Sequence, residues 1–491
     1  MIKRLLAFAL LAANPGQAQL QPASVVRTEG GPVGGAPFDG GYVFRGIPFA
    51  APPTGPLRWK PPQPPTPWRS VRASQPQPAS CLQNDYGWNR GDVVIGSEDC
   101  LTLDVRTPAL VGHRPVLVWI HGGSNLAGGP NDIVLSDVGE KVVIVGVRYR
   151  LGLFGFLAHR GAAAEAGGHA GNYGLMDQAA ALGWVRRNIA RFGGDPDQVT
   201  IAGESAGAQD VSLMLAAPST RGLFRRAIVE SGTPGFGLPP RPLAEALRLG
   251  DQLDAAMGSG GSIDKLRAMS ATALLAADRT LHDDALESDD YRFLRVTIDG
   301  AYLPDDPAAL LARAGQPDVL IGSNRVELNL PGDRPHRDAF VAKATGPRET
   351  AARAYYRLDE PDPPVDPRLG ERDQIIATDL TFRCPTVHLA TLLARRGQRV
   401  WHYEFDAAPG GGRTTHAREI SYAFGADQYA PGQSLKPYWL NFIMTGDPNG
   451  PGLATWPRFD PGAQQHLLFD SGGAHVEGPL RPEACALNAR L

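Results

Sequence analysis

One run near the middle of the chain constrains its fold most strongly: residues 199–207, which read Val-Thr-Ile-Ala-Gly-Glu-Ser-Ala-Gly. A strand-like apolar stretch leads into Gly203-x-Ser205-x-Gly207, and a helical pattern follows. This is the context of a nucleophile elbow, in which a serine sits on a sharp strand-to-helix turn and glycines prevent clashes with the neighbouring strand and helix. We therefore predict that Ser205 is a nucleophile. An ordinary Gly-rich turn is the alternative in a chain with 58 glycines.

Six short, continuously apolar runs predict strands that are buried on both faces. They are residues 116–120, 142–147, 199–202, 227–229, 319–321 and 400–405. Helical patterns lie between them, for example from Leu175 to Ile189. Such runs suit a largely parallel sheet covered by helices on both sides, which indicates an α/β fold. We expect residues 19–491 to form a single domain, with a helical insertion at 241–292 that covers the active-site edge of the sheet.

The predicted strand at 116–120 ends in a second glycine motif, His121-Gly122-Gly123-Ser124. Acyl transfer passes through a tetrahedral intermediate with a negatively charged oxygen. Preorganised backbone N–H groups stabilise this oxygen by roughly 3–4 kcal/mol per donor. We predict that Gly122 and Gly123 donate from this turn and that Ala206 donates from the position after the serine. A β-turn without a ligand is the alternative.

A serine hydroxyl needs a base, and a neutral imidazole removes its proton well near pH 7. In a fold of this kind the chain order is nucleophile, acid, base. The histidines after the serine are His282, His336, His388, His402, His416, His466 and His475. His416 follows the predicted strand at 400–405 through a Gly-rich loop, at the carboxyl edge of the sheet. We predict that His416 is the base, and that His402 and His388 are packing residues.

The acid of such a site holds the imidazole in one tautomer and stabilises its protonated form. Residues 318–327 read as a strand followed by a short loop that ends in Glu327. We therefore predict that Glu327 is the acid. Asp299 and Asp306 are rivals that precede this strand, and Asp406, at the end of a later strand, is a lesser rival.

The charges of the chain are nearly balanced, with a formal net charge of −3 and no long basic run. Nucleic acid and anionic membrane surfaces are therefore not expected as main partners. The sequence contains no His-Glu-x-x-His, Cys-x-x-Cys or Gly-Lys-Ser/Thr motif. We expect neither a metal nor an organic cofactor.

Residues 1–18 have the pattern of a secretory signal peptide. Lys3 and Arg4 supply positive charge, and residues 5–13 are apolar but too short to span a bilayer. Gly16 and Ala18 offer small residues at the two recognition positions before Gln19. A buried N-terminal helix is the alternative. No later segment is long and apolar enough to cross a membrane. We expect a secreted or periplasmic protein.

Four cysteines allow three disulfide pairings, and export permits them to form. Cys81 and Cys100 flank a short, polar, turn-rich stretch, which favours their pairing. Cys384 and Cys485 would then close a long loop. Four free thiols are the alternative if the chain is cytosolic.

Several further motifs resemble those of the type-B carboxylesterases, a family that includes cholinesterases, vertebrate liver carboxylesterases and bacterial p-nitrobenzyl esterases. The likeness covers nearly all of the mature chain. The matching segments are residues 44–50 (Phe-Arg-Gly-Ile-Pro-Phe-Ala), 57–62, 98–105 (Glu-Asp-Cys-Leu-Thr-Leu-Asp-Val), 188–190, 192–196 (Phe-Gly-Gly-Asp-Pro), 445–449 and 456–457. The resemblance implies an α/β-hydrolase fold and hydrolysis of small-molecule carboxylic esters through an acyl-serine.

The resemblance also bears on individual residues. Glu327 aligns with the family's acid, and His416 lies in a segment, 415–420, that matches the family's histidine segment. The same two disulfide pairings are implied. The family further implies that Ser231 is a buried helper near the acid, although an ordinary serine after a strand would look the same.

The chain departs from the family pattern at two places near these residues. Ala417 stands where the family usually has glycine. Residues 328–336 are polar and contain proline where the family often continues with a glycine and apolar residues, so we expect an altered pocket wall.

Other activities fit the same residues. The family includes catalytically inactive adhesion proteins, but these have lost the nucleophile, whereas Ser205 is present here. A lipase, thioesterase or amidase would use the same chemistry with a different pocket. Trp88 lies in the region where cholinesterases carry their choline-binding aromatic residue, and we interpret it as a surface residue. The natural ester and the oligomeric state stay open.

Overall fold

The structure is a computed structural model that describes residues 24–488, apart from residues 285, 287, 314–316, 331 and 409–411. The predicted signal peptide at residues 1–18 lies outside the described residues.

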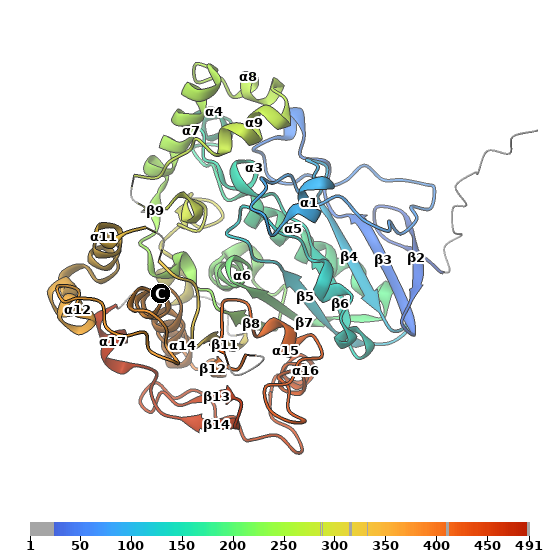
Figure 1. The fold of residues 1–491 in the computed structure, drawn as a ribbon. Coiled ribbons are helices and arrows are strands. Elements are labelled where there is room, and N and C mark those ends of the chain that lie inside the picture. The colour runs from blue at the N-terminus through green and yellow to red at the C-terminus, as the bar shows by residue number, and fades with distance from the viewer. Residues whose placement is uncertain are drawn as a thin grey trace, which may run out of the picture.

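A large sheet forms the centre of the molecule (Figure 1). Its strands are β1 (Ser24–Arg27), β2 (Pro32–Phe38), β3 (Gly41–Pro48), β4 (Thr102–Thr107), β5 (Arg114–Ile120), β6 (Val143–Val147), β7 (Gly194–Glu204), β8 (Arg226–Glu230), β11 (Asp318–Asn324), β12 (Val400–Asp406), β13 (His466–Asp470) and β14 (Gly473–Glu477). Their spatial order is β1-β2-β3-β4-β6-β5-β7-β8-β11-β12-β13-β14. Neighbours from β6 to β13 in this order run parallel, and the pairs at both ends run antiparallel. A separate pair joins β9 (Arg241–Pro242) to β10 (Thr297–Ile298).

All six predicted strands lie in the parallel part of the sheet, which confirms a mostly parallel α/β architecture. β5 shows why these runs are apolar throughout. Val116, Val118 and Ile120 belong to the hydrophobic core on one face, whereas Leu117 and Trp119 belong to the core on the other. Because both faces are covered, every position from Val116 to Ile120 is buried.

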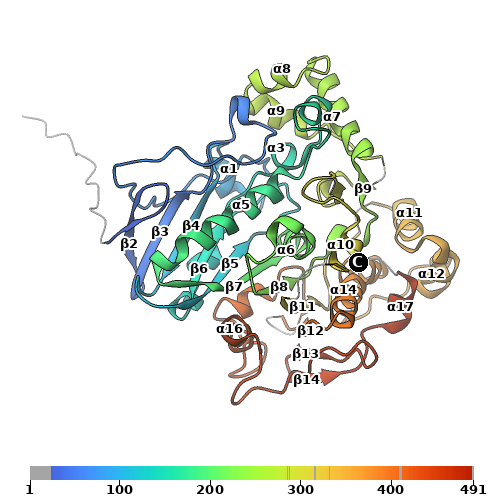
Figure 2. The ribbon, with the colours of Figure 1, turned by 180° about the vertical axis from the view of Figure 1, so that it is seen from behind.

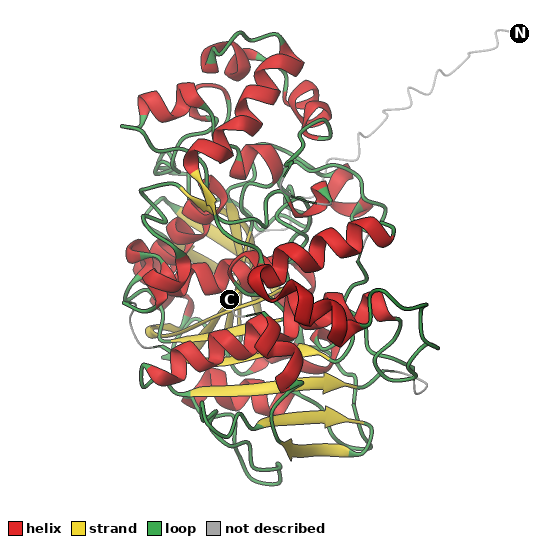
Figure 3. Cartoon of the chain, turned by 90° about the vertical axis from the view of Figure 1, so that its left-hand side faces the viewer, coloured by secondary structure: helices red, strands yellow, loops and turns green. Residues whose placement is uncertain are grey.

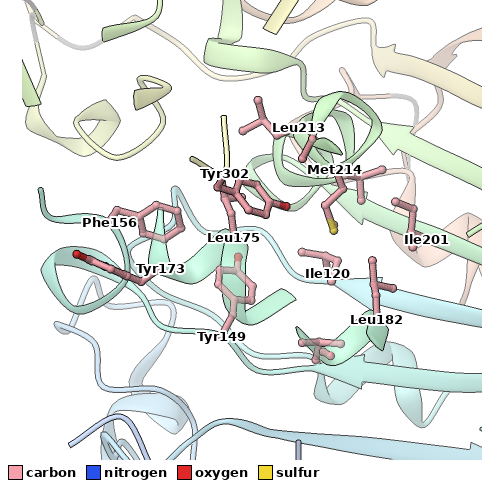
Figure 4. Close-up of a cluster of buried hydrophobic side chains, with 14 of the residues drawn as sticks. Ile120, Tyr149, Phe156, Tyr173, Leu175, Leu182, Ile201, Leu213, Met214 and Tyr302 are labelled. Carbon is pink, nitrogen blue, oxygen red and sulfur yellow. The ribbon is translucent and has the colours of Figure 1, made fainter. Parts of the chain in front are cut away.

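Helices cover both faces of the sheet (Figures 2 and 3). On one face, α5 (Tyr173–Asn188), α6 (Ala206–Ala216) and α14 (Cys384–Arg395) contribute to one core. Figure 4 shows part of this core, with Leu182 of α5 and Met214 of α6 near Ile120 and Ile201 of the sheet. On the other face, α2 (Asn131–Val134), α15 (Ile420–Ala423) and α16 (Lys436–Thr445) pack with the second core. The remaining helices include α1 (Arg90–Val94), α3 (Gly152–Phe156), α4 (Arg160–Glu165), α10 (Pro307–Leu311), α11 (Arg334–Thr345), α12 (Glu349–Tyr356), α13 (Arg372–Ala377) and α17 (Pro482–Leu487).

The predicted insertion is helical, as expected. It contains α7 (Leu243–Met257), α8 (Ile263–Ala268) and α9 (Ala271–Asp278), which pack on α3 and α4 at one end of the molecule (Figure 1). The chain then returns toward the candidate site, where Leu286 and Tyr291 line a pocket described below.

Both predicted disulfides are present: Cys81 is bonded to Cys100 and Cys384 to Cys485. They join residues 19 and 101 positions apart in the chain. Among the helices of the described residues, none combines the length and the apolar character needed to cross a bilayer.

Candidate active site

Ser205 occupies the turn between β7 and α6, with φ 56° and ψ −125°. This backbone conformation is strained for a residue with a side chain. A Cβ added to Gly203 would lie 2.5 Å from the carbonyl carbon of Gly207, and one added to Gly207 would lie 2.1 Å from a carbonyl oxygen of β5. The two glycines are therefore required by the close approach of the backbone, as the motif predicts.

Three side chains that are far apart in sequence meet at the carboxyl edge of the sheet. His416 Nε2 lies 2.8 Å from Ser205 Oγ, and His416 Nδ1 lies 2.6 Å from Glu327 Oε2. Glu327 follows β11 and His416 follows β12, so adjacent parallel strands bring both residues to the same edge as the elbow. The imidazole thus contacts a hydroxyl with one nitrogen and a carboxylate with the other.

Two hydrogen bonds hold the carboxylate of Glu327 in place, and a third holds its backbone. The hydroxyl of Ser231 and the backbone N–H of Asn324 each donate to Oε1 from 2.7 Å. The backbone N–H of Glu327 donates to Thr378 Oγ1 at 3.1 Å. Oε2 is left to face the imidazole. Ser231 therefore occupies the helper position that the family resemblance implies.

A second buried carboxylate, Glu419, lies behind this group. Its Oε1 lies 3.1 Å from Ser231 Oγ, and its Oε2 accepts a hydrogen bond from Asn324 Nδ2. Burial and the neighbouring charge of Glu327 raise the pKa of Glu419 to about 7. Ser231 thus lies between the carboxyl groups of Glu327 and Glu419.

Glu204, the residue before the nucleophile, places its Oε1 3.2 Å from His416 Nε2. Burial raises the pKa of Glu204 to about 8. Burial also disfavours the charged form of His416, but the carboxylates of Glu204 and Glu327 together outweigh this effect and raise its pKa to about 9. The imidazole is therefore more basic than an exposed histidine.

This basicity predicts how activity depends on pH. Attack by the predicted nucleophile Ser205 would need the neutral imidazole, so kcat/KM is expected to fall as the pH falls through the pKa of His416, with an acid limb above the usual histidine value of 6.5. Glu204→Gln removes one stabilising charge and is expected to move this limb to lower pH by about one unit. Glu140→Gln, at an exposed position, is the control. An acid limb in Glu204→Gln that coincides with wild type would contradict this prediction.

The loop after β5 lies directly against Ser205. A Cβ added to Gly122 would lie 3.0 Å from Ser205 Cβ, and one added to Gly123, whose φ is +104°, would lie 2.1 Å from a carbonyl oxygen of its own loop. Within the described residues, the N–H groups of Gly122 and Gly123 have no hydrogen-bond acceptor. Ala206 is the first residue of α6, directly after Ser205.

The two departures from the family pattern have visible consequences. Ala417 adopts φ 62°, in the region that favours glycine, so the alanine takes on backbone strain next to His416. Leu328, Leu330 and His336, from the altered segment, line the pocket beside the site.

Trp88 is both exposed and close to the candidate site. Its side chain is 65% exposed, which agrees with the interpretation as a surface residue. A Cβ added to Gly123 would nevertheless lie 3.1 Å from the Trp88 ring, so the indole covers the outer side of the glycine loop.

The rival residues are engaged elsewhere. Asp299 accepts from the N–H groups of Ala301 and Leu303, and Asp306 caps α10. Asp406 pairs with arginines. His402 is buried in β12, and His388 contacts carbonyl oxygens near the C-terminus.

An apolar pocket adjoins the imidazole. Its lining residues are Phe236, Leu238, Leu286, Ser288, Tyr291, Leu328, Leu330, His336, Phe340, Ala377, Thr381 and Phe382. The rings of Phe382 and His416 lie 5.0 Å apart, and Phe236 and Phe382 form one buried cluster with Ala206. Phe382 therefore places one wall of the pocket next to the imidazole, and Phe236 and Phe382 place it near Ala206, although neither Ser205 nor His416 lines the pocket itself.

Sequence reasoning missed three residues of this neighbourhood: Glu204, Glu419 and Phe382. Glu204 precedes Ser205 at the end of a buried strand, and Glu419 follows His416 by three positions, so their places in the motifs were available as signals. Phe382 lies in a short π-helix, Thr378–Arg383, which no motif indicates.

Within the described parts of the chain, no group of three or more His, Cys, Asp or Glu side chains could hold a metal ion. The mostly parallel sheet, the helices on both faces and the strand-to-helix turn at Ser205 define an α/β-hydrolase fold.

Comparison with known proteins gives the family. A profile described as "Carboxylesterase family" matches residues 22–488. Carboxylesterase 1E of Rattus norvegicus is 34% identical over 486 residues, which cover 85% of this chain and 84% of the relative. Para-nitrobenzyl esterase of Bacillus subtilis (strain 168) is 33% identical over 485 residues, which cover 91% and 95%.

Solved structures agree. A PNB esterase structure has 30% identity and a TM-score of 0.81, covering 94% of this chain and 99% of that chain. The Geobacillus stearothermophilus carboxylesterase at pH 6.2 has 30% identity and a TM-score of 0.79 with the same coverage. The chain belongs to the carboxylesterase family and is a carboxylic ester hydrolase that acts on small-molecule esters.

Proposed function

We propose that the chain hydrolyses esters through an acyl-enzyme on Ser205, with His416 as general base and acid and Glu327 as its charged partner. The observation that carries this proposal is the imidazole of His416, 2.8 Å from Ser205 Oγ on one side and 2.6 Å from Glu327 on the other. Such an arrangement allows the imidazole to accept the serine proton while the carboxylate stabilises the resulting cation.

The reaction would proceed in two halves. His416 Nε2 removes the hydroxyl proton as Ser205 Oγ attacks the ester carbonyl, and N–H groups of Gly122, Gly123 and Ala206 stabilise the oxyanion. As the intermediate collapses, the imidazolium protonates the departing alcohol. Water then attacks the acyl-serine with the same base, and the carboxylic acid and free Ser205 are released.

The apolar pocket indicates the kind of ester. Its walls contact both Ala206 and His416 through Phe236 and Phe382. An apolar acyl or alcohol group would bury surface there, with a gain of about 0.8 kcal/mol per methylene. We propose that esters with an extended apolar group are preferred over acetates.

A panel of p-nitrophenyl esters tests this preference, with kcat/KM expected to rise from acetate to hexanoate. Phe340→Asp places a charge in the pocket wall without touching the triad, and is expected to reduce hexanoate turnover roughly tenfold more than acetate turnover. Val111→Asp, at an 85% exposed side chain, is the control. Equal losses for both esters would reject the pocket assignment. Turnover of a thioester and of an anilide with the same acyl group, measured beside the ester, distinguishes thioesterase and amidase activity from esterase activity.

We further propose that residues 1–18 are removed on export and that residues 19–491 act as one domain in a secreted or periplasmic protein. The two disulfides support an oxidising location. The amino-terminal sequence of the exported protein tests this proposal, with Gln19 expected first.

A further inference from the structure

The proposed oxyanion donors come from two separate segments. Gly122 and Gly123 lie in the loop after β5, whereas Ala206 begins α6. Three N–H groups can converge on one oxygen only if the loop keeps a fixed position relative to the helix.

The loop itself is strained. Gly123, Ser124 and Asn125 follow one another with φ values of 104°, 57° and 57°. Two of these three residues carry side chains in a backbone region that favours glycine. Such a conformation persists only when the surroundings hold it.

Asn125 supplies an anchor between loop and helix. Its side chain is fully buried, and its Nδ2 donates to Asp210 Oδ1 at 3.2 Å. Asp210 lies on α6, five residues after the nucleophile. The hydrogen bond therefore joins the segment that carries Gly122 and Gly123 to the helix that carries Ala206.

Tyr149 and Gln178 complete this polar group. Tyr149, which lies in the core of Figure 4, donates to the His121 carbonyl oxygen at 2.7 Å and reaches Asn125 Oδ1 at 3.4 Å. Gln178 donates to the second carboxyl oxygen of Asp210. Among the described residues, no Lys, Arg or His forms an ion pair with Asp210.

Resting on the proposed function, we propose that Asn125 and Asp210 are a pair of positioning residues that set the geometry of the oxyanion hole. Both side chains are fully buried, so they are assigned to act through the loop and the helix and not on a substrate. Their hydrogen bond holds the strained glycine loop against α6, so that donors from both segments point at one oxygen.

Asn125→Gly removes the amide and keeps the positive φ, and Asp210→Ala removes the acceptor. Each is expected to lower kcat on p-nitrophenyl butyrate roughly ten- to hundredfold, with KM changed less than about threefold. The double variant is expected to lose no more than the worse single variant, because both remove one interaction.

A trifluoromethyl ketone provides a readout that stability alone would not move. Ser205 Oγ adds to its carbonyl carbon, the C=O π bond opens to an oxyanion, and the serine proton passes to His416. The inhibition constant is expected to rise by a factor similar to the loss in kcat. Ser212→Ala is the matched control, because it removes a buried hydrogen bond within α6, from Ser212 Oγ to the Gln209 carbonyl oxygen. It should keep wild-type kcat and inhibition.

A volume-conserving pair keeps the test decisive if the truncated variants fail to fold. Asn125→Asp places two carboxyl groups in contact and is expected to lower kcat, and adding Asp210→Asn restores an amide–carboxyl bond and should recover most of it. Wild-type kcat and an unchanged inhibition constant in folded variants at Asn125 and at Asp210 would overturn this inference. The proposed function would stay intact in that case if Ser205→Ala is inactive. An active Ser205→Ala would instead overturn the proposed function.

Discussion

Ser205→Ala is expected to lower kcat on p-nitrophenyl butyrate at least roughly a thousandfold, because the acyl-enzyme can no longer form. The residual rate above the uncatalysed reaction would come from the oxyanion donors and from binding alone. Steady-state release of p-nitrophenol, measured against a no-enzyme blank, gives the factor.

The control for this variant is Ser212→Ala, at a buried serine on the helix that follows the nucleophile. Its turnover should match wild type. Thermal unfolding of both variants checks that the fold is retained. Turnover within a few-fold of wild type in a folded Ser205→Ala would remove Ser205 from the mechanism.

His416→Ala is expected to cause a loss of at least roughly a thousandfold as well, since among the described residues no other histidine forms a hydrogen bond with Ser205 Oγ. Glu327→Gln should lose less than Ser205→Ala, because the hydroxyl and the imidazole both remain. The same assay, run across pH, measures these losses.

His475→Ala is the matched control, because His475 is about half exposed and pairs with Asp470 far from Ser205 in the sheet order. It should retain full activity. A His416→Ala variant with turnover close to wild type would contradict the assignment of the base, and Glu327→Gln losing more than His416→Ala would contradict the order of the roles.

The central part of the fold was predictable because strands that are buried on both faces have continuous apolar runs in the sequence. β5, β6, β7, β8, β11 and β12 each coincide with an apolar run. β1 to β4 at one end and β13 and β14 at the other were not predicted. β1, β2, β3 and β14 have several partly exposed positions, and β4 and β13 are buried but contain polar residues, so none of the six has a continuous apolar run.

The candidate site was predictable where a backbone constraint or a family motif marks it. A Cβ at Gly203 or Gly207 would lie less than 3 Å from backbone atoms, so only glycine fits at these two positions. This requirement makes the elbow recognisable in the sequence. Glu204 and Glu419 were missed as parts of the site, because a glutamate reads as a surface residue until its burial is known.

The bond between Asn125 and Asp210 illustrates what sequence reasoning leaves out. The two residues are 85 positions apart, and neither belongs to a motif that predicts the other. Only the packing of the β5 loop against α6 brings this buried amide and carboxyl group together.

The central claim is that an acyl group is carried on Ser205, and covalent labelling tests it most directly. Wild-type protein treated with diethyl p-nitrophenyl phosphate is expected to gain one diethylphosphoryl group and to release one equivalent of p-nitrophenol. Peptide mass spectrometry is expected to locate the diethylphosphoryl group on Ser205. Esterase activity should fall in proportion to the fraction of protein labelled. Labelling at another residue, or full activity in protein labelled on Ser205, would contradict the account.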